Sequence, residues 1–376
     1  MLRIIFILFI IFSLSACERS EYDAARAAYD AGDYETAFNK FLPMAESGNA
    51  KAQNALGLMY EREHGVTGDL VKASEWYSKS AEQGWARAQH NLGMMYQQGR
   101  GVTQDYTKAY KWYLKAAEQG VAAAQIRLAQ AYVQGSGVKR DYWEAMKWSR
   151  KAAVQGNAEA QANIGDMFHE GFGVPQDYVE AVKWYRKAAE QGWAGAQHNL
   201  GVMHQKGRSV TQDYAEAIQW YRKAAEQGFA NSQSNLGYMY LEGLGVERNY
   251  TEALNWSFKG AEQEDALSLY TLGILYKEGL GVSQDDTEAL KWQLKAGQKG
   301  HIMAQYNLGT MFHFGQGTPK DDIKAYAWFG VAAASGFKPA QNPRDVIGVQ
   351  MSPGELEQAR KLARELWQKY VIKNDS

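Results

Sequence analysis

The feature that most constrains this chain is a sequence period of 36 residues. Trp recurs in steps of 36 at Trp76, Trp112, Trp148, Trp184, Trp220, Trp256, Trp292 and Trp328. Gly recurs in the same frame at Gly48, Gly84, Gly120, Gly156, Gly192, Gly228, Gly300 and Gly336, and Glu264 takes the one remaining position. A long repeat found this many times predicts stacked units that bury their apolar faces only against neighbouring units.

Each unit has the pattern of two helices, as residues 85–120 show. The apolar stripe of the first helix contains Ala88, Leu92, Met95 and Tyr96. The stripe of the second contains Ala109, Trp112, Tyr113 and Ala116. Gly99 and Gly101 are expected to end the first helix, because Gly adopts a positive φ at little cost, and Asp105 is a good N-cap for the second. The Trp and Met columns are interpreted as core because each keeps a fixed place in the repeat.

No segment has the alternation of a strand set, so the predicted fold class is all-α, an α/α superhelical solenoid of about eight 36-residue helix-turn-helix repeats. The eight repeats are placed at residues 49–336, after a degenerate N-terminal repeat or cap at 17–48. Residues 337–376 are predicted to form a closing segment whose last helix begins with a capping box at Ser352 and Glu355. We expect altered packing where Glu264 and Asp265 interrupt the Gly column.

The first sixteen residues are predicted to be a targeting segment. Arg3 precedes an unbroken apolar run over residues 4–12, which is too short for a bilayer span of about 20 residues and has the size of a signal-peptide hydrophobic region. The run leads into Leu14-Ser15-Ala16-Cys17, which resembles the lipobox of bacterial lipoproteins, and Cys17 is the one Cys in the chain. That resemblance implies cleavage before Cys17 and its lipidation, although an ordinary signal peptide remains the alternative. Glu18 favours the outer over the inner membrane.

Composition excludes several function classes. The formal net charge of −1 argues against nucleic-acid binding, and one Cys excludes an intramolecular disulfide or a Cys-based zinc site. The Gly-x-Gly segments follow helices and lack the Lys-Ser/Thr of a phosphate-binding loop. The His residues are scattered, and although His169 and His198 might share a pocket, no third metal ligand is evident. We therefore predict no cofactor, no metal and no catalytic residues.

The repeat motif resembles a known family. Residues 88–120 contain A-x-x-x-L-G-x-M-Y, G-x-G-V-x-x-D-Y and W-Y-x-K-A-A-E-Q-G, which is similar to the Sel-1-like repeat, a relative of the tetratricopeptide repeat. The resemblance implies a protein-interaction scaffold, and it implies no enzymatic activity. By analogy with tetratricopeptide repeats, first-helix residues would line a concave, partner-binding face. The candidate partner-binding residues are Arg87, His90, Gln97, Asp166, His169, His198, Gln205, Tyr238, Tyr270, Tyr306, His313 and Phe314.

Three functions are compatible with these observations. The leading hypothesis is a non-catalytic scaffold, lipid-anchored in the bacterial envelope on the periplasmic side, which binds a protein or an extended peptide. The first alternative is a surface-exposed virulence factor that binds host proteins, as the resemblance to this family allows. The second alternative is a hydrolase acting on cell-wall material, which would be supported by an activity that disappears when His169 and His198 are changed.

Overall fold

The computed structural model describes residues 21–372, and within them every regular element is a helix. The predicted signal segment and Cys17 lie outside the described residues. The fold is an all-α solenoid of helix-turn-helix repeats, which confirms the predicted fold class. The chain divides into two compact units whose boundary falls between Trp184 and Tyr185, inside α10 (Tyr178–Glu190).

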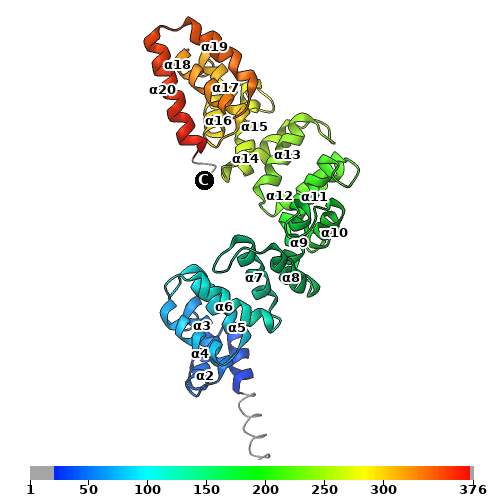
Figure 1. Ribbon diagram of the computed structural model, residues 1–376, viewed down its shortest axis with the longest axis vertical. Helices are drawn as coiled ribbons and strands as arrows, with labels where there is room; N and C mark the ends of the chain where they lie inside the picture. Colours follow the sequence, from blue (N-terminus) through cyan, green and yellow to red (C-terminus); the bar gives the residue numbers. More distant parts are fainter. Residues whose placement is uncertain (1–20, 373–376) are drawn as a thin grey trace, which may run out of the picture. The chain divides into compact units, whose positions relative to one another are not determined.

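The N-terminal unit begins with a helix over residues 21–30 and continues with helix pairs (Figure 1). Its further helices before α10 are α2 (Tyr34–Glu46), α3 (Ala50–Arg62), α4 (Leu70–Glu82), α5 (Ala86–Gln98), α6 (Tyr106–Glu118), α7 (Ala122–Gln134), α8 (Tyr142–Val154) and α9 (Ala158–Glu170). Consecutive helices pack against each other, so the core is a string of local clusters.

The C-terminal unit repeats the same arrangement and ends in three extra elements (Figure 1). Its repeat helices are α11 (Ala194–Lys206), α12 (Tyr214–Glu226), α13 (Ala230–Glu242), α14 (Tyr250–Glu262), α15 (Ala266–Glu278), α16 (Asp286–Gln298), α17 (Ile302–Phe314) and α18 (Asp322–Ala334). The extra elements are the 3-10 turn η1 (Lys338–Ala340), α19 (Gln341–Gln350) and α20 (Pro353–Tyr370). The capping box predicted at Ser352 and Glu355 is present, and α20 packs against α18.

The helix ends predicted from the Gly and Asp positions are confirmed. Gly99 follows α5 with a φ of 68°, and the Asp105 carboxylate accepts a hydrogen bond from the Lys108 backbone N–H at 2.9 Å. The second Gly of the Gly-x-Gly segment serves a contact between repeats. A Cβ on Gly101 would lie 1.9 Å from the backbone oxygen of Leu70, at the start of the preceding second helix. Gly-x-Gly is therefore a packing element.

The Trp column is only partly a core filler, which corrects the sequence-based interpretation. Trp148, Trp220, Trp256 and Trp328 are buried, whereas Trp76, Trp112, Trp184 and Trp292 remain partly exposed. In at least six of the eight repeats the Lys three residues later lies over the Trp ring, for example Lys151 at 3.9 Å from the Trp148 ring centroid. The alkyl chain and ammonium of Lys cover the outer ring face by a cation–π contact, so Trp lies at the edge of the core.

The fully buried ring is instead the Tyr that follows Trp. Tyr77, Tyr113, Tyr185 and Tyr221 are at most 2% exposed. A Cβ on Gly93 would lie 2.7 Å from the Tyr113 ring, and Gly57 and Gly201 have the same relation to Tyr77 and Tyr221. The Gly that follows Leu in these first helices therefore makes room for this ring.

A ladder of buried glutamines joins consecutive repeats. Gln89 donates from Nε2 to the Ala81 backbone oxygen at 3.2 Å, and its Oε1 accepts from Gln119 Nε2 at 2.8 Å. Gln53, Gln125, Gln197 and Gln233 make the same two bonds. Each Gln adds a side-chain donor to a carbonyl of the last helical turn, which also accepts from the backbone N–H of the Gly that ends the helix. Leu269 interrupts the ladder in the seventh repeat, and in the eighth repeat Gln305 again donates to a helix-end carbonyl, the Gly297 backbone oxygen at 3.1 Å.

The junction at Glu264 keeps its turn but packs differently from the others. Glu264 adopts a φ of 58°, close to the left-handed backbone of the Gly residues that it replaces, so α14 and α15 keep the usual bounds. However, α13 and α15 are in closer contact than any other successive first helices within one described unit. Gly260 of α14 lets α15 pack closely against it, since a Cβ there would lie 2.1 Å from Ser268 Oγ. The predicted change in packing is present at this junction.

Candidate partner-binding surface

The candidate surface is the first-helix face, which we define as the side chains of α3, α5, α7 and α9 in the N-terminal unit and of α11, α13, α15 and α17 in the C-terminal unit that are not fully buried. Side-chain hydrogen bonds join neighbouring first helices across this face. Asn91 Nδ2 donates to Asn54 Oδ1 at 3.1 Å, and Gln130 Nε2 donates to Glu159 Oε1 at 2.8 Å. Adjacent repeats therefore present a continuous surface within each unit.

Arg87 lines a cavity at the N-terminal end of this face. The cavity has a volume of about 170 Å³. Its walls are Tyr22, Arg26, Tyr29, Phe41, Asn54, Ala55, Leu58, Trp85 and Arg87. The Lys51 ammonium lies 5.4 Å from the Trp85 ring centroid, so cationic and aromatic groups surround the opening together. This combination suits a partner group that is aromatic or carries a negative charge.

His90 and His198 occupy the same position in their repeats, and both imidazoles have a lowered pKa. The pKa of each imidazole is lowered to about 4, mainly by burial, and the Arg127 charge contributes to the lowering at His90. His198 Nδ1 lies 2.9 Å from Ser232 Oγ, and its ring packs against Tyr221 and Phe229. His90 packs against Tyr113. Both rings are neutral at pH 7, so they offer polar and aromatic contacts without charge.

Gln97 and Gln205 hold buried tyrosines. The Tyr113 hydroxyl donates to Gln97 Oε1 at 2.6 Å, and the Tyr221 hydroxyl donates to Gln205 Oε1 at 2.6 Å. Both Gln side chains are partly buried, and each satisfies a hydroxyl that would otherwise lack a partner. A structural role therefore accounts for these residues before any role in recognition.

The remaining polar candidates lie on two helices, α9 and α17. Asp166 is exposed on α9. On the same helix, His169 Nδ1 lies 2.7 Å from Glu170 Oε1, and His169 packs against Tyr178. His313 on α17 lies with Nδ1 2.6 Å from Asp322 Oδ1. His169 belongs to the N-terminal unit and His198 to the C-terminal unit, and each pairs with a different group inside its own unit.

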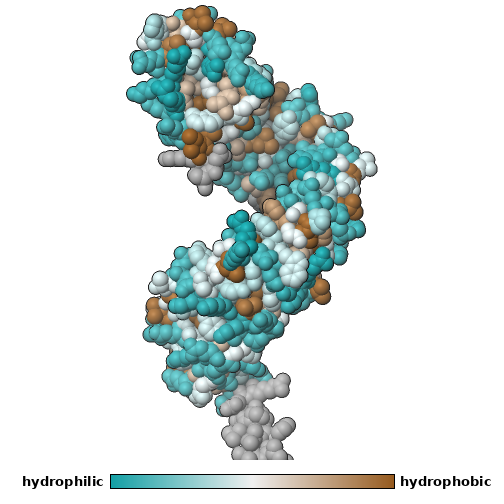
Figure 2. All heavy atoms as spheres, in the orientation of Figure 1, coloured by the Kyte–Doolittle hydropathy of each residue, from teal (hydrophilic) through white to brown (hydrophobic). Residues whose placement is uncertain are grey.

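The predicted aromatic residues of the C-terminal unit fall into different environments. Tyr270 on α15 stacks on His301 with ring centroids 4.2 Å apart, and burial raises the pKa of both Tyr238 and Tyr270. Tyr306 is partly buried against Phe329 and Phe337, and so also belongs to the core of the last repeat. Phe314, at the end of α17, is 69% exposed. Figure 2 shows such hydrophobic patches scattered over a mainly hydrophilic surface.

Sequence reasoning missed one contributing position, the residue immediately before each first helix. At three places its ring contacts the first-helix residue that lies 31 positions earlier. The contacting pairs are His198 with Phe229, Tyr270 with His301, and Tyr306 with Phe337. Trp85 and Asn54, also 31 apart, line the N-terminal cavity together. The signal was available as a column that varies between Trp, Val, Phe, His, Asn and Asp, but it lies outside the helix stripes.

Among residues 21–372, no group of three or more His, Cys, Asp or Glu side chains is arranged to hold a metal ion. No helix in that part of the chain has both the length and the apolar composition needed to cross a bilayer.

Comparison with known proteins identifies the repeat. The Sel1 repeat matches eight consecutive segments, at residues 50–85, 86–121, 122–157, 158–193, 194–229, 230–265, 266–301 and 302–337. The chain belongs to the Sel1 repeat family. A search of curated protein sequences gave no significant match.

Two solved structures share this Sel1 repeat fold with substantial identity. A Sel1 repeat protein from Oxalobacter formigenes is 37% identical, with a TM-score of 0.61 over 64% of this chain and 99% of that chain. The protein c5321, described as a protective antigen present in uropathogenic Escherichia coli strains, is 30% identical, with a TM-score of 0.61 over 96% of this chain and 86% of that chain.

Membership defines the broad function class of this Sel1 repeat protein. Sel1 repeat proteins are generally scaffolds for protein–protein interaction, and the family and its structural neighbours are generally non-catalytic. The first-helix face agrees with that class, because aromatic and neutral polar groups are the residue types that anchor protein partners.

Proposed function

We propose that this Sel1 repeat protein is a non-catalytic scaffold, anchored in the bacterial envelope by a lipid on Cys17, whose first-helix face binds a protein or an extended peptide. The observation that supports the binding face is the pairing of first-helix residues with rings 31 positions later in the sequence. The pairing is clearest where Tyr270 stacks on His301. A ring already held by a neighbouring ring loses little conformational entropy when a partner binds it. Such pairs supply preformed anchors for a partner.

The electrostatics of these anchors favour contacts that do not depend on charge. Burial lowers the pKa of His301 to about 4, as it does for His90 and His198, so these rings are neutral at pH 7. Neutral rings provide apolar surface together with a single hydrogen-bonding edge. The proposed partner segment therefore presents aromatic, aliphatic or amide groups to this face.

The lipid anchor is proposed from sequence alone. Leu14-Ser15-Ala16-Cys17 follows a short apolar run, and the proposed location is the periplasmic face of the envelope, with Glu18 favouring the outer membrane. Several acyl chains on one residue anchor a protein stably, since each buried methylene contributes about 0.8 kcal/mol. Cys17→Ala should move the protein from the membrane fraction into the soluble periplasmic fraction. Unchanged membrane fractionation of that variant would refute the anchor.

Site-specific photocrosslinking tests the binding face. A photoreactive residue placed at Tyr270 or His198 should capture envelope proteins, whereas one placed at Trp143 or Val179 should not. The two control positions are exposed on the second helices α8 and α10. Capture from the second-helix positions alone would show that the first-helix face has been assigned wrongly.

A second candidate, a surface-exposed protein that binds host proteins, is favoured by one comparison. The Escherichia coli protein that is 30% identical over 96% of this chain is described as a protective antigen. An antigen that protects is expected to be accessible outside the cell. Protease digestion of intact cells separates the two proposals, because a surface-exposed chain is cut without permeabilisation and a periplasmic chain is cut only after it.

A further inference from the structure

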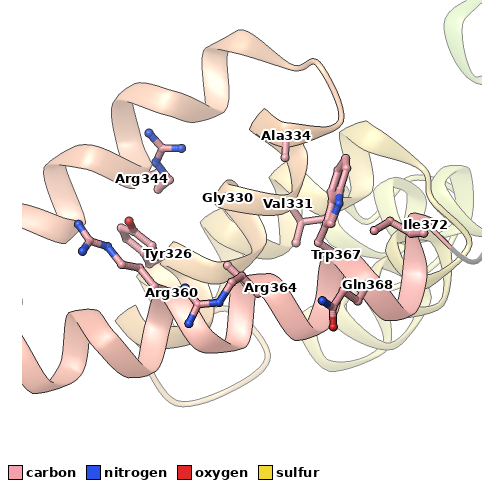
Figure 3. A pocket seen from close by; sticks show the side chains of 11 residues that line it. Tyr326, Gly330, Val331, Ala334, Arg344, Arg360, Arg364, Trp367, Gln368 and Ile372 are labelled. Carbon is pink, nitrogen blue, oxygen red and sulfur yellow. The ribbon is translucent and has the colours of Figure 1, made fainter.

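A cavity of about 410 Å³ lies between α18, α19 and α20, outside the first-helix face. We call it the cap pocket. Its lining residues are Tyr326, Gly330, Val331, Ala334, Arg344, Arg360, Ala363, Arg364, Trp367, Gln368 and Ile372. Figure 3 shows the three arginines gathered toward one end of the cavity and Trp367 and Ile372 toward the other. The volume lies within the range of about 300–1,000 Å³ that is usual for ligand pockets.

The charge in the cap pocket is positive and largely unpaired. Arg344 pairs with its neighbour Asp345 at 2.6 Å. Arg360 and Arg364 make no ion pair or hydrogen bond with any residue of the described part of the chain. None of the lining residues carries a carboxylate.

The positions of Arg360 and Arg364 add an energetic argument. They are four residues apart on α20, so they lie on one helix face. Like charges at this spacing repel each other and destabilise a helix. An anion bound between them would replace that repulsion with charge-assisted hydrogen bonds, since guanidinium groups bind carboxylates with two parallel bonds.

The other part of the pocket is apolar. Trp367, Val331 and Tyr326 provide its walls, and Ile372 at its edge is 53% exposed. Gly330 lets α18 lie close to α20 at the floor of the pocket, because a Cβ there would already touch the Ala363 Cβ at 3.5 Å. Figure 2 shows hydrophobic residues exposed at the C-terminal end of α20, and Figure 1 gives the position of this helix in the same view.

We propose that the cap pocket binds an acidic segment of a protein partner in which an aromatic or branched aliphatic side chain lies beside two or more carboxylates. The apolar side chain would enter between Trp367 and Val331, and the carboxylates would pair with Arg360 and Arg364. Charge complementarity favours this occupant over a neutral peptide or a basic one. The site is separate from the first-helix face, so it stands whether or not that face binds the partner proposed above.

The test uses the full chain and a synthetic peptide. The probe is a fluorescein-labelled, C-terminally amidated hexapeptide, Glu-Asp-Phe-Asp-Glu-Leu, and binding is followed by fluorescence anisotropy. Arg360→Gln combined with Arg364→Gln should weaken binding at least tenfold. Lys361→Gln combined with Lys369→Gln is the matched control, because it removes the same charge from α20 outside the pocket and should change the affinity less than twofold.

Two further measurements separate the proposal from general charge attraction. The Gln-Asn-Phe-Asn-Gln-Leu peptide and the peptide with Ala in place of Phe should each bind at least tenfold more weakly than the probe. Ala334→Leu fills the edge of the cavity without changing charge, and it should also weaken binding. Circular dichroism of each variant confirms that the fold is retained.

Three results would overturn the cap pocket as a peptide site. One is equal binding of the probe to the Arg360/Arg364 variant and to the Lys361/Lys369 variant. Another is undiminished binding of the neutral peptide. The third is that the Arg360/Arg364 variant loses binding to phosphatidylglycerol vesicles but keeps binding to the peptide. That result would assign the arginines to a lipid surface. Crosslinking from Tyr270 should be the same in the Arg360/Arg364 variant and the wild type.

Discussion

At the scale of single residues, the repeat depends on the packing of a buried aromatic ring against a Gly of the first helix. The Trp and Gly columns could be recognised in the sequence because each recurs with little variation. The sequence could not show which of two adjacent aromatic residues is buried, since Trp112 and Tyr113 both lie on the apolar stripe of α6. The structure decides in favour of Tyr, because its ring lies over Gly93 while its hydroxyl reaches Gln97.

This relation predicts a coupled pair of substitutions. Gly93→Ala places a Cβ 2.7 Å from the Tyr113 ring and should destabilise the fold by about 1–3 kcal/mol through overpacking. In a Tyr113→Ser background the same change should cost almost nothing, because the third repeat already combines Ala129 with Ser149 at these positions. Urea unfolding of the four proteins measures the coupling, and additive effects of the two substitutions would contradict it.

His198 predicts a pH dependence of stability. Its pKa in the folded state is about 4, below the ordinary value of 6.5, so the unfolded chain binds a proton more readily between these values. Stability is therefore complete above pH 6.5 and falls as the pH drops toward 4. His198→Asn should reduce the loss of stability between pH 7.5 and pH 5 by about 1–2 kcal/mol. Equal losses in wild type and variant, measured by urea unfolding, would show that the folded-state pKa is not lowered.

At the scale of elements, the sequence predicted most of the helix ends and few of the contacts between helices. Gly99, Asp105 and the Ser352 capping box mark helix ends by local chemistry, which a sequence displays directly. The glutamine ladder requires bonds over 8 and 30 residues, so it emerges only once the helices are packed. The same holds for the cap pocket, whose residues come from three elements.

The turn at Glu264 provides a prediction for one element boundary. Glu264→Gly should stabilise the protein by about 0.5–1 kcal/mol, because a residue with a Cβ is strained at a φ of 58°. The exposed ion pair with Lys299 that is lost contributes little. Gly228→Glu is the reverse experiment at a turn with a φ of 88° and open space around the new Cβ, and it should destabilise by about 1–2 kcal/mol. Thermal unfolding measures both, and a destabilising Glu264→Gly would contradict the assignment of strain.

At the scale of the whole molecule, the period of 36 residues led to the fold class but not to the division into two compact units. A solenoid gains its stability from contacts between neighbouring repeats, so each end needs a closing element. In the C-terminal unit α20 closes the last repeat, where Tyr370 stacks on Trp328 and Ala359 is buried. Of the twelve predicted surface residues, Arg87 lines a cavity, and Tyr270 and His198 pair with rings, whereas Gln97 and Gln205 support buried tyrosines.

Nearest-neighbour stability predicts a local response to loss of the cap. Removing residues 353–376 exposes Trp328 and Ile347, so amide hydrogen exchange should accelerate at least tenfold in α17 and α18. Exchange in α3 to α6 should stay the same, because in a solenoid the loss of an end element destabilises the repeats next to it in sequence. Faster exchange throughout the chain would show that the repeats unfold as one cooperative unit.

The central claim, that the first-helix face binds a protein partner, is tested most directly by quantitative mass spectrometry of proteins purified with the full chain from its native cells. Tyr270→Ser combined with His198→Ser should reduce recovery of the principal partner at least tenfold relative to wild type. Trp143→Ser, which removes an aromatic ring 63% exposed on the second helix α8, should leave recovery unchanged. Equal recovery with the wild type and the Tyr270/His198 variant, or a loss confined to Trp143→Ser, would contradict the account.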